Sequence, residues 1–206
     1  MKIGLLGGSF NPPHQGHIHI SLEAKKRLDL KRVWWIPAKR NPLKVVSGKS
    51  LVVSRIEDCQ KITQKYKQIL VKDLEKDIKS RHCEERQRRD AAIQFLPQHS
   101  GLPRLRLAMT ETVYTIDLLK KIIKENPHQQ FFWIIGADNI LQFHKWKNWR
   151  KIIKLVPLIV CDREDFFYKA VKSKAFLYAK KMNRIEFLKI KKSPESSTRI
   201  RALSNR

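Results

Sequence analysis

Two histidines, three residues apart, follow a turn rich in glycine and proline near the start of the chain. The segment, which we call the signature segment, reads Gly7-Gly8-Ser9-Phe10-Asn11-Pro12-Pro13-His14-Gln15-Gly16-His17. An apolar stretch precedes it and a helical pattern follows it, which predicts a strand, a turn and a helix. A helix N-terminus after such a turn points backbone N–H groups at a phosphate, and imidazoles there can donate hydrogen bonds to its oxygens. The segment therefore indicates chemistry on a nucleotide phosphate.

Glycine and proline are expected to shape this turn. Gly7 and Gly8 are expected to adopt backbone conformations closed to other residues and to let a ligand approach closely, and the prolines stiffen the exit. The segment has neither the Gly-Lys-Ser/Thr ending of a Walker loop nor the Gly-x-Gly-x-x-Gly spacing of a dinucleotide fingerprint. The alternative interpretation is a structural turn with incidental histidines.

The positioning elements alternate along the chain. Strands are expected over 3–6, 33–36, 69–71, 131–135, 158–161 and 185–190. Helices are expected over 17–29, from a cap at Ser50 to about 65, over 115–125 with Thr115 as N-cap and Asp117 in the first turn, and over 168–182, with a final helix capped at 196–198. This order predicts an α/β fold with a Rossmann-like, doubly wound parallel sheet. In such sheets ligands bind beyond the carboxyl ends of the strands.

Size and composition fit one intracellular domain. The 206 residues are interpreted as a single domain spanning 1–206, with a charged surface insertion at about 76–110, part of which (84–95) could form an exposed helix. Three cysteines at spacings that fit no metal site favour a reducing, cytoplasmic compartment. The N-terminus does not resemble a signal peptide, and no apolar run approaches a membrane span.

The chain is strongly basic. Lys and Arg number 44 against 19 Asp and Glu, a net charge of +25. The basic residues are spread along the whole sequence rather than gathered in one arm. We therefore interpret them as solvated faces that also attract anionic substrates, and we regard nucleic acid as an unlikely partner.

Together these motifs resemble bacterial nicotinate-nucleotide adenylyltransferases, members of the nucleotidylyltransferase superfamily with a His-x-Gly-His element. The resemblance lies in the signature segment, in Ile135-Gly136-Ala137-Asp138-Asn139 followed by Phe143-His144-Lys145-Trp146, in Tyr114-Thr115, and in Ser196-Ser197-Thr198-Arg199-Ile200-Arg201. It implies that the 5′-phosphate of nicotinate mononucleotide attacks the α-phosphorus of ATP and releases pyrophosphate. Mg²⁺ would bridge the phosphates and be held largely by the substrate, with no metal site in the chain. A homo-oligomer is left open.

The resemblance also implies residue roles. His14 and His17 are the expected catalytic residues, and the expected ATP-binding residues are Gly8, Ser9, Phe10, His14, His17, Gly136, Asp138, Ser197, Thr198 and Arg201. Nicotinate mononucleotide is expected to bind Asn11, Lys44, Tyr114, Thr115 and Trp146. Several have structural alternatives: Asp138 as a helix cap, and Trp146 and Trp149 as core-facing aromatics on one helix, the interpretation preferred for Trp149.

Three other functions stay open at this point. One is a different adenylyltransferase, such as the phosphopantetheine enzyme, which the Gly-Ala-Asp-Asn and tryptophan elements argue against. A second is a preference for nicotinamide over nicotinate mononucleotide. The third, from a different class, is a decayed enzyme scaffold that binds RNA, a reading that both retained histidines argue against.

Overall fold

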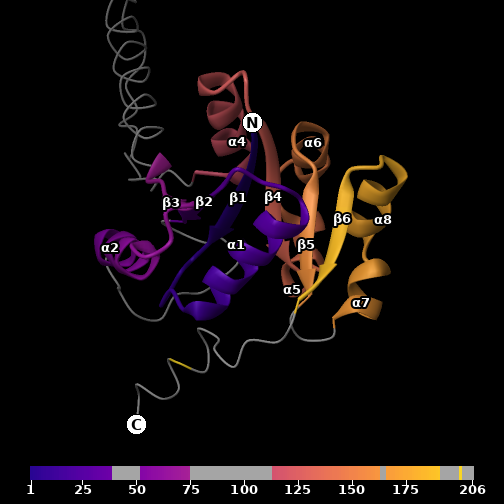
Figure 1. Cartoon of the computed structure of the whole chain (residues 1–206). Coiled ribbons are helices and arrows are strands. Elements are labelled where there is room, and N and C mark those ends of the chain that lie inside the picture. The colour runs from indigo at the N-terminus through magenta and orange to yellow at the C-terminus, as the bar shows by residue number, and fades with distance from the viewer. Residues whose placement is uncertain (39–51, 75–112, 163–165, 191–199, 201–206) are drawn as a thin grey trace, which may run out of the picture.

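A computed structural model describes residues 1–38, 52–74, 113–162, 166–190 and 200. Its centre is a six-stranded, all-parallel sheet of order β3-β2-β1-β4-β5-β6 (Figure 1). The strands are β1 Lys2–Gly8, β2 Arg32–Pro37, β3 Ile69–Val71, β4 Gln130–Gly136, β5 Leu158–Asp162 and β6 Ile185–Lys189. The predicted doubly wound α/β fold and all six strands are confirmed.

Helices cover both faces of this sheet. They are α1 Gln15–Arg27, α2 Val52–Thr63, α4 Thr115–Glu125, α5 Ala137–Ile140, the 3-10 helix Phe143–Lys145, α6 Trp149–Leu155, α7 Phe167–Val171 and α8 Lys174–Lys181. One buried cluster joins α1 and α2 to the sheet, and the other joins α4, α6 and α8 to the opposite face. Because both faces are covered, the central strands are apolar along their length, as parallel strands require.

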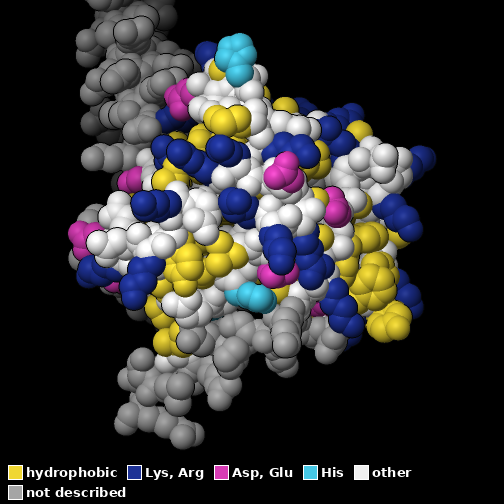
Figure 2. Space-filling model, in the orientation of Figure 1, with side chains coloured by type: hydrophobic (Ala, Val, Ile, Leu, Met, Phe, Trp, Pro, Cys, Tyr) yellow, Lys and Arg dark blue, Asp and Glu magenta, His cyan; other side chains and the backbone are white. Residues whose placement is uncertain are grey.

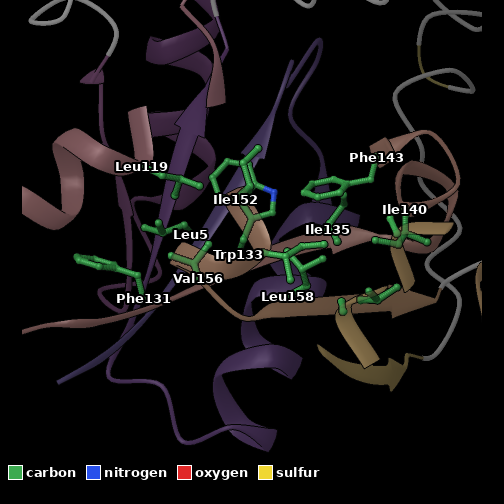
Figure 3. Packing of buried hydrophobic residues seen from close by; sticks show 14 of the residues in the cluster. Leu5, Leu119, Phe131, Trp133, Ile135, Ile140, Phe143, Ile152, Val156 and Leu158 are labelled. Carbon is green, nitrogen blue, oxygen red and sulfur yellow. The ribbon is translucent and has the colours of Figure 1, made fainter. Parts of the chain in front are cut away.

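Alternation along the strands divides the core. In β1, Leu5 points to one cluster and Leu6 to the other. Figure 3 shows the cluster under α4, α6 and α8, in which Leu5, Trp133 and Leu158 from three neighbouring strands pack with Leu119 and Ile152. Side chains that alternate with a period of two fill both faces at once, so a slip of one residue would exchange the two cores.

Several predicted helix boundaries are wrong. The helix expected over 168–182 is two helices, because the Ser173 hydroxyl accepts a hydrogen bond from the Phe176 N–H at 3.3 Å and caps α8. The first helix begins at Gln15 rather than 17, since His14 caps it. Tyr114, not Thr115, is the N-cap of α4, whereas Asp117 lies in its first turn as predicted.

Some expected features lie outside the described residues. These are the insertion at 76–110 with its candidate helix 84–95, most of the basic loop 38–50, the Ser50 cap and the cap of the final helix at 196–198. In the part of the chain that the structure covers, no helix is long and apolar enough to cross a membrane.

The strand order reverses direction beside β1. The chain runs from β1 through β2 to β3 on one side, and then returns to place β4 on the other side of β1. The pairs end at Leu6↔Ile134, so Gly8 and Gly136 follow two residues later on neighbouring strands. The crevice beyond such a switch point is where open α/β sheets bind ligands, and α1 and α5 both begin there (Figure 1).

Candidate active site

The two signature histidines lie against each other at the start of α1. Their ring centroids are 3.9 Å apart with the planes tilted by 44°. His14 is the N-cap: its Nδ1 accepts from the Gly16 N–H at 3.1 Å, and the Nδ1 of His17 accepts from the His14 N–H at 3.3 Å. The reciprocal pair forms a capping box, which satisfies two backbone donors that a helix start otherwise leaves without partners.

This capping box fixes the tautomer of both neutral imidazoles. A nitrogen that accepts a hydrogen bond carries no proton, so the proton of each neutral ring resides on Nε2. Each ring thus carries its N–H group at the helix N-terminus, where the helix dipole also favours an anion. N–H donors at a helix N-terminus are suited to phosphate oxygens, and phosphate binding by this histidine pair stays a prediction.

Buried aromatic rings pack against His17. Phe10 lies 4.8 Å from the His17 ring and stacks on Trp35 at 4.8 Å and 21°. The Trp35 Nε1–H donates to the Ser21 hydroxyl, which donates to the His17 carbonyl, both at 2.8 Å. Ser21 and Trp35 are fully buried, so these hydrogen bonds have no competition from water. Neither Ser21 nor Trp35 was predicted from the sequence to belong to the site.

The backbone conformation expected of the two glycines is wrong, whereas the expected close approach of a ligand stays a prediction. Gly7 and Gly8 belong to strand β1, and the left-handed backbone conformation falls on Phe10, with φ 44°. That conformation costs a non-glycine residue about 1 kcal/mol. Gly7 is instead required for packing, because a Cβ there would lie 2.5 Å from Cη2 of Trp133. Trp133 therefore rests on the end of β1.

Gly136 and Asp138 lie at the end of β4, as predicted. Gly136 is the N-cap of α5, and no side chain makes a capping hydrogen bond there. The alternative of Asp138 as the helix cap is therefore wrong. Asp138 lies in the first turn with an exposed side chain, and its carboxylate folds back over Gly136 so that a Cβ on Gly136 would clash with it. The carboxylate is accessible to a ligand at the switch point.

Three of the residues expected around nicotinate, Tyr114, Thr115 and Trp146, lie in neighbouring segments. Trp146 ends the 3-10 helix, packs on Phe143 at 4.8 Å and meets Trp133 edge-on at 6.4 Å. The next residue, Lys147, places its Nζ 4.0 Å from the centre of the Tyr114 ring. Tyr114 and Thr115 therefore lie beside the Trp146 segment, although they are far apart in sequence. Trp133 then joins this cluster to Gly7.

Trp146 and Trp149 are not on one helix, contrary to the sequence analysis. Trp146 follows the 3-10 helix and Trp149 begins α6. Trp149 packs edge-on against Tyr178 at 5.2 Å and against the core, which confirms it as a structural aromatic. Asn11 is half-buried within the signature segment.

Four predicted site residues, Lys44, Ser197, Thr198 and Arg201, lie outside the described residues. Positive charge is nevertheless abundant on one face of the molecule. On the face that Figure 2 shows, Lys and Arg side chains are distributed over much of the surface, with few acidic ones between them. Such a field raises the local concentration of anionic ligands. Within the described residues no group of three His, Cys, Asp or Glu side chains is placed to hold a metal ion.

Comparison with known proteins agrees with this geometry. Residues 5–203 match the cytidylyltransferase-like family model, so the chain belongs to the cytidylyltransferase-like family of nucleotidyltransferases. It is 35% identical over 202 residues to the "Probable nicotinate-nucleotide adenylyltransferase" of Pelagibacter ubique (strain HTCC1062), which covers 98% of this chain and 93% of the relative. A protein of the same name from Bradyrhizobium sp. (strain ORS 278) is 34% identical over 85% of this chain and 74% of its own. Within the larger family, the chain is a member of the nicotinate-nucleotide adenylyltransferases.

Solved structures show the same fold. Nicotinic acid mononucleotide adenylyltransferase of Plasmodium falciparum, complexed with NaAD, matches with a TM-score of 0.64 and 18% identity, over 98% of this chain and 82% of that one. A putative nicotinate-nucleotide adenylyltransferase of Vibrio parahaemolyticus matches with a TM-score of 0.53 and 18% identity, over 98% and 84%. The six-stranded sheet is therefore the sheet of this family.

Proposed function

We propose that the chain transfers the adenylyl group of ATP to nicotinate mononucleotide, giving nicotinate adenine dinucleotide and pyrophosphate. The observation that carries the proposal is the pair of adjacent histidine rings, both fixed through Nδ1, at the N-terminus of α1 beside the switch point. The names of the relatives support the choice of substrates. The solved Plasmodium enzyme was complexed with NaAD, the product of such a reaction.

In this mechanism His14 and His17 stabilise charge rather than move protons. An oxygen of the nicotinate mononucleotide phosphate forms a bond to the α-phosphorus of ATP, and the bond from that phosphorus to the bridging oxygen of pyrophosphate breaks. Negative charge grows on the phosphate oxygens as this happens. Two Nε2–H donors held in advance interact with that charge without reorganisation, which is how most phosphoryl and nucleotidyl transfers are accelerated. No covalent enzyme intermediate is required.

Further ATP contacts are proposed at the carboxyl ends of β1 and β4. Ser9 and the backbone from Gly8 to Phe10 are proposed to hold phosphate, and the exposed Asp138 carboxylate to accept hydrogen bonds from a ribose. Ser197, Thr198 and Arg201 complete the triphosphate site in the proposal. A divalent cation, proposed to be Mg²⁺, would arrive with the ATP phosphates and neutralise part of their charge.

The nicotinate ring is proposed to bind the Trp146 cluster. Trp146 offers an aromatic face, while Thr115 and the first N–H groups of α4 offer donors to the ring carboxylate. Lys147, above Tyr114, adds a positive charge beside that helix end. A charged carboxylate gains from this arrangement more than a neutral amide does, so the proposal includes preference for nicotinate. Asn11 and Lys44 are assigned to the same substrate.

Three further expectations stay proposals. The enzyme is proposed to act in the cytoplasm, and the buried Cys59 is a free thiol in the structure. Nucleic acid is not proposed as a partner. The oligomeric state is left open.

The test is pyrophosphate release from ATP with three acceptors: nicotinate mononucleotide, nicotinamide mononucleotide and phosphopantetheine. Turnover that favours nicotinate mononucleotide and disappears in His17→Ala is expected. Turnover with another acceptor alone would reassign the substrate, and a folded protein inactive with all three would overturn the proposal.

A further inference from the structure

A buried arginine joins the signature segment to the neighbouring strand. Arg55 lies on α2 and is only 7% exposed. One nitrogen, Nη1, donates to the Ser9 carbonyl at 2.7 Å and to the Ala38 carbonyl at 2.9 Å. Ser9 follows the end of β1, and Ala38 follows the end of β2. Both bonds are short for a nitrogen donor and have a charged donor, so they belong to the stronger class of hydrogen bonds.

The place of these carbonyls gives Arg55 its significance. The Ser9 carbonyl immediately precedes Phe10, whose left-handed backbone turns the chain toward His14. The Ala38 N–H also donates to the Gly8 carbonyl at 2.8 Å. Arg55 therefore joins the ends of two adjacent strands at the point where the signature segment leaves the sheet, and it places a positive charge directly behind Ser9.

We propose that Arg55 is a positioning residue, which fixes the Ser9–Phe10 backbone for the ATP phosphates and contributes a buried positive charge behind them. This inference rests on the proposed function for its substrate, ATP. A cation in a poorly hydrated site acts on nearby charges with little screening. The guanidinium thus favours a polyanion in front of the segment while its two hydrogen bonds hold the turn.

The sequence contains a signal for this residue. Buried polar residues on α2 include Arg55 and Thr63, with the buried Cys59 between them, each four residues from the next. Residues spaced by four share one face of a helix, so Arg55 lies on the face that meets the sheet. An arginine on an inward face is rarely left buried without a specific partner.

The experiment compares Arg55→Ala with Arg55→Lys and with Thr63→Ala. Thr63 is a matched control on the same helix: it is 6% exposed and its hydroxyl donates to the Cys59 carbonyl at 2.8 Å, far from the signature segment along α2. Kinetics are measured at a temperature where circular dichroism shows every variant folded. For Arg55→Ala we expect kcat/KM for ATP to fall by about 100-fold, the size of effect that misplacement by about 1 Å produces, with a raised KM for ATP.

A merely structural role would give a different result. Loss of stability alone reduces the amount of active protein and leaves KM unchanged, and this is the result expected for Thr63→Ala. Arg55→Lys keeps the charge and one donor nitrogen and should recover part of the ATP affinity. Millimolar guanidinium should partly restore Arg55→Ala and have no effect on Thr63→Ala. If Arg55→Ala has the KM and kcat of the wild type within about twofold, the proposal is overturned.

ATP binding in the absence of acceptor separates this proposal from the function proposed above. Isothermal titration with ATP and Mg²⁺ should show weaker binding to Arg55→Ala than to the wild type, whichever acceptor the enzyme uses. Wild-type protein that binds ATP but does not adenylate nicotinate mononucleotide would contradict the proposed function alone. Equal ATP affinity in both proteins would contradict the role of Arg55 alone.

Discussion

Replacing Gly7 by alanine tests whether the end of β1 supports the nicotinate site through Trp133. The new Cβ would lie 2.5 Å from Cη2 and 2.6 Å from Cζ2 of that indole. Ordinary contact begins at 3.4 Å, so the ring must retreat by roughly 0.9 Å, a typical overpacking distortion. Trp133 is 3% exposed and meets Trp146 edge-on, so a rigid ring cannot move without disturbing its neighbour.

The expected effect has two parts. Overpacking of a filled core lowers the free energy of unfolding by about 1–3 kcal/mol. Displacement of Trp146 by a similar distance should lower kcat/KM for nicotinate mononucleotide by about 10- to 100-fold, mainly through KM. The KM for ATP should change much less, because the contacts of the two histidines with the helix backbone do not involve Trp133.

Gly4→Ala is the matched control on the same strand. Its Cβ would lie 2.8 Å from Cδ1 of Ile134 and 2.9 Å from Cδ1 of Leu30, the ends of flexible side chains. This variant should lose stability without a change in the acceptor KM. Urea unfolding and steady-state kinetics with each substrate provide the comparison. The reasoning is refuted if Gly7→Ala keeps the wild-type KM for nicotinate mononucleotide, or changes it no more than Gly4→Ala does.

Three other residues, His14, Lys147 and Cys59, give further predictions, two for the site and one for stability. His14→Asn should keep the cap of α1, since asparagine is a favoured N-cap, yet lower turnover by roughly 100- to 1000-fold because the Nε2–H donor is lost; His14→Ala should lose turnover and also about 1 kcal/mol of stability. Lys147→Gln should reduce the preference for nicotinate over nicotinamide mononucleotide by about fivefold, the effect of one partly exposed charge. Burial, with a smaller contribution from Asp58, raises the pKa of the Cys59 thiol from 9.0 to about 12. As the pH rises, the unfolded chain therefore loses the thiol proton before the folded chain does. The contribution of the protonated thiol to the free energy of unfolding should be present below pH 9 and decline as the pH rises toward 12.

Each of these predictions has its own check. Normal turnover in His14→Asn, measured by pyrophosphate release, would remove His14 from the chemistry. An unchanged ratio of kcat/KM values for the two mononucleotides in Lys147→Gln would exclude a role of Lys147 in discriminating nicotinate from nicotinamide. Lys145→Gln, which alters the adjacent surface, is the control. For Cys59, urea unfolding between pH 8 and pH 11 should lose its thiol-dependent slope in Cys59→Ala; an identical slope in both proteins would contradict the assignment.

The sequence contained most of the fold. Strong apolar runs such as 33–36 and 131–135 became central strands because both faces of a parallel sheet are covered. The prediction of one helix over 168–182 was wrong because the helical pattern of residue types continues through Ser173. The backbone of Ser173 is extended, and its hydroxyl caps a new helix, α8. Thr115 was misassigned as a cap because Tyr114 has the extended backbone of an N-cap but no capping side chain. Such boundaries depend on single dihedral angles, which a pattern of residue types does not encode.

The site residues that are close together in the sequence could be predicted, and those brought together only by folding could not. His14 and His17 share one helix end, so their spacing alone placed them together. Trp133 and Trp35 pack at the same site from other elements, and each resembles an ordinary core residue in sequence. Their roles follow from register and packing. The predicted freedom of Gly7 was wrong for the same reason, since a packed indole, rather than a turn, requires glycine there.

The central claim is direct transfer of an adenylyl group at the paired histidines. The measurement that tests it most directly uses ATP labelled at the α-phosphate, incubated with nicotinate mononucleotide and the wild type or His17→Ala. The account predicts that the label appears in the dinucleotide with the wild type, that unlabelled pyrophosphate is released in equal amount, and that both products are lost in His17→Ala. Label retained on the protein or released as AMP, or dinucleotide formed equally by His17→Ala, would contradict it.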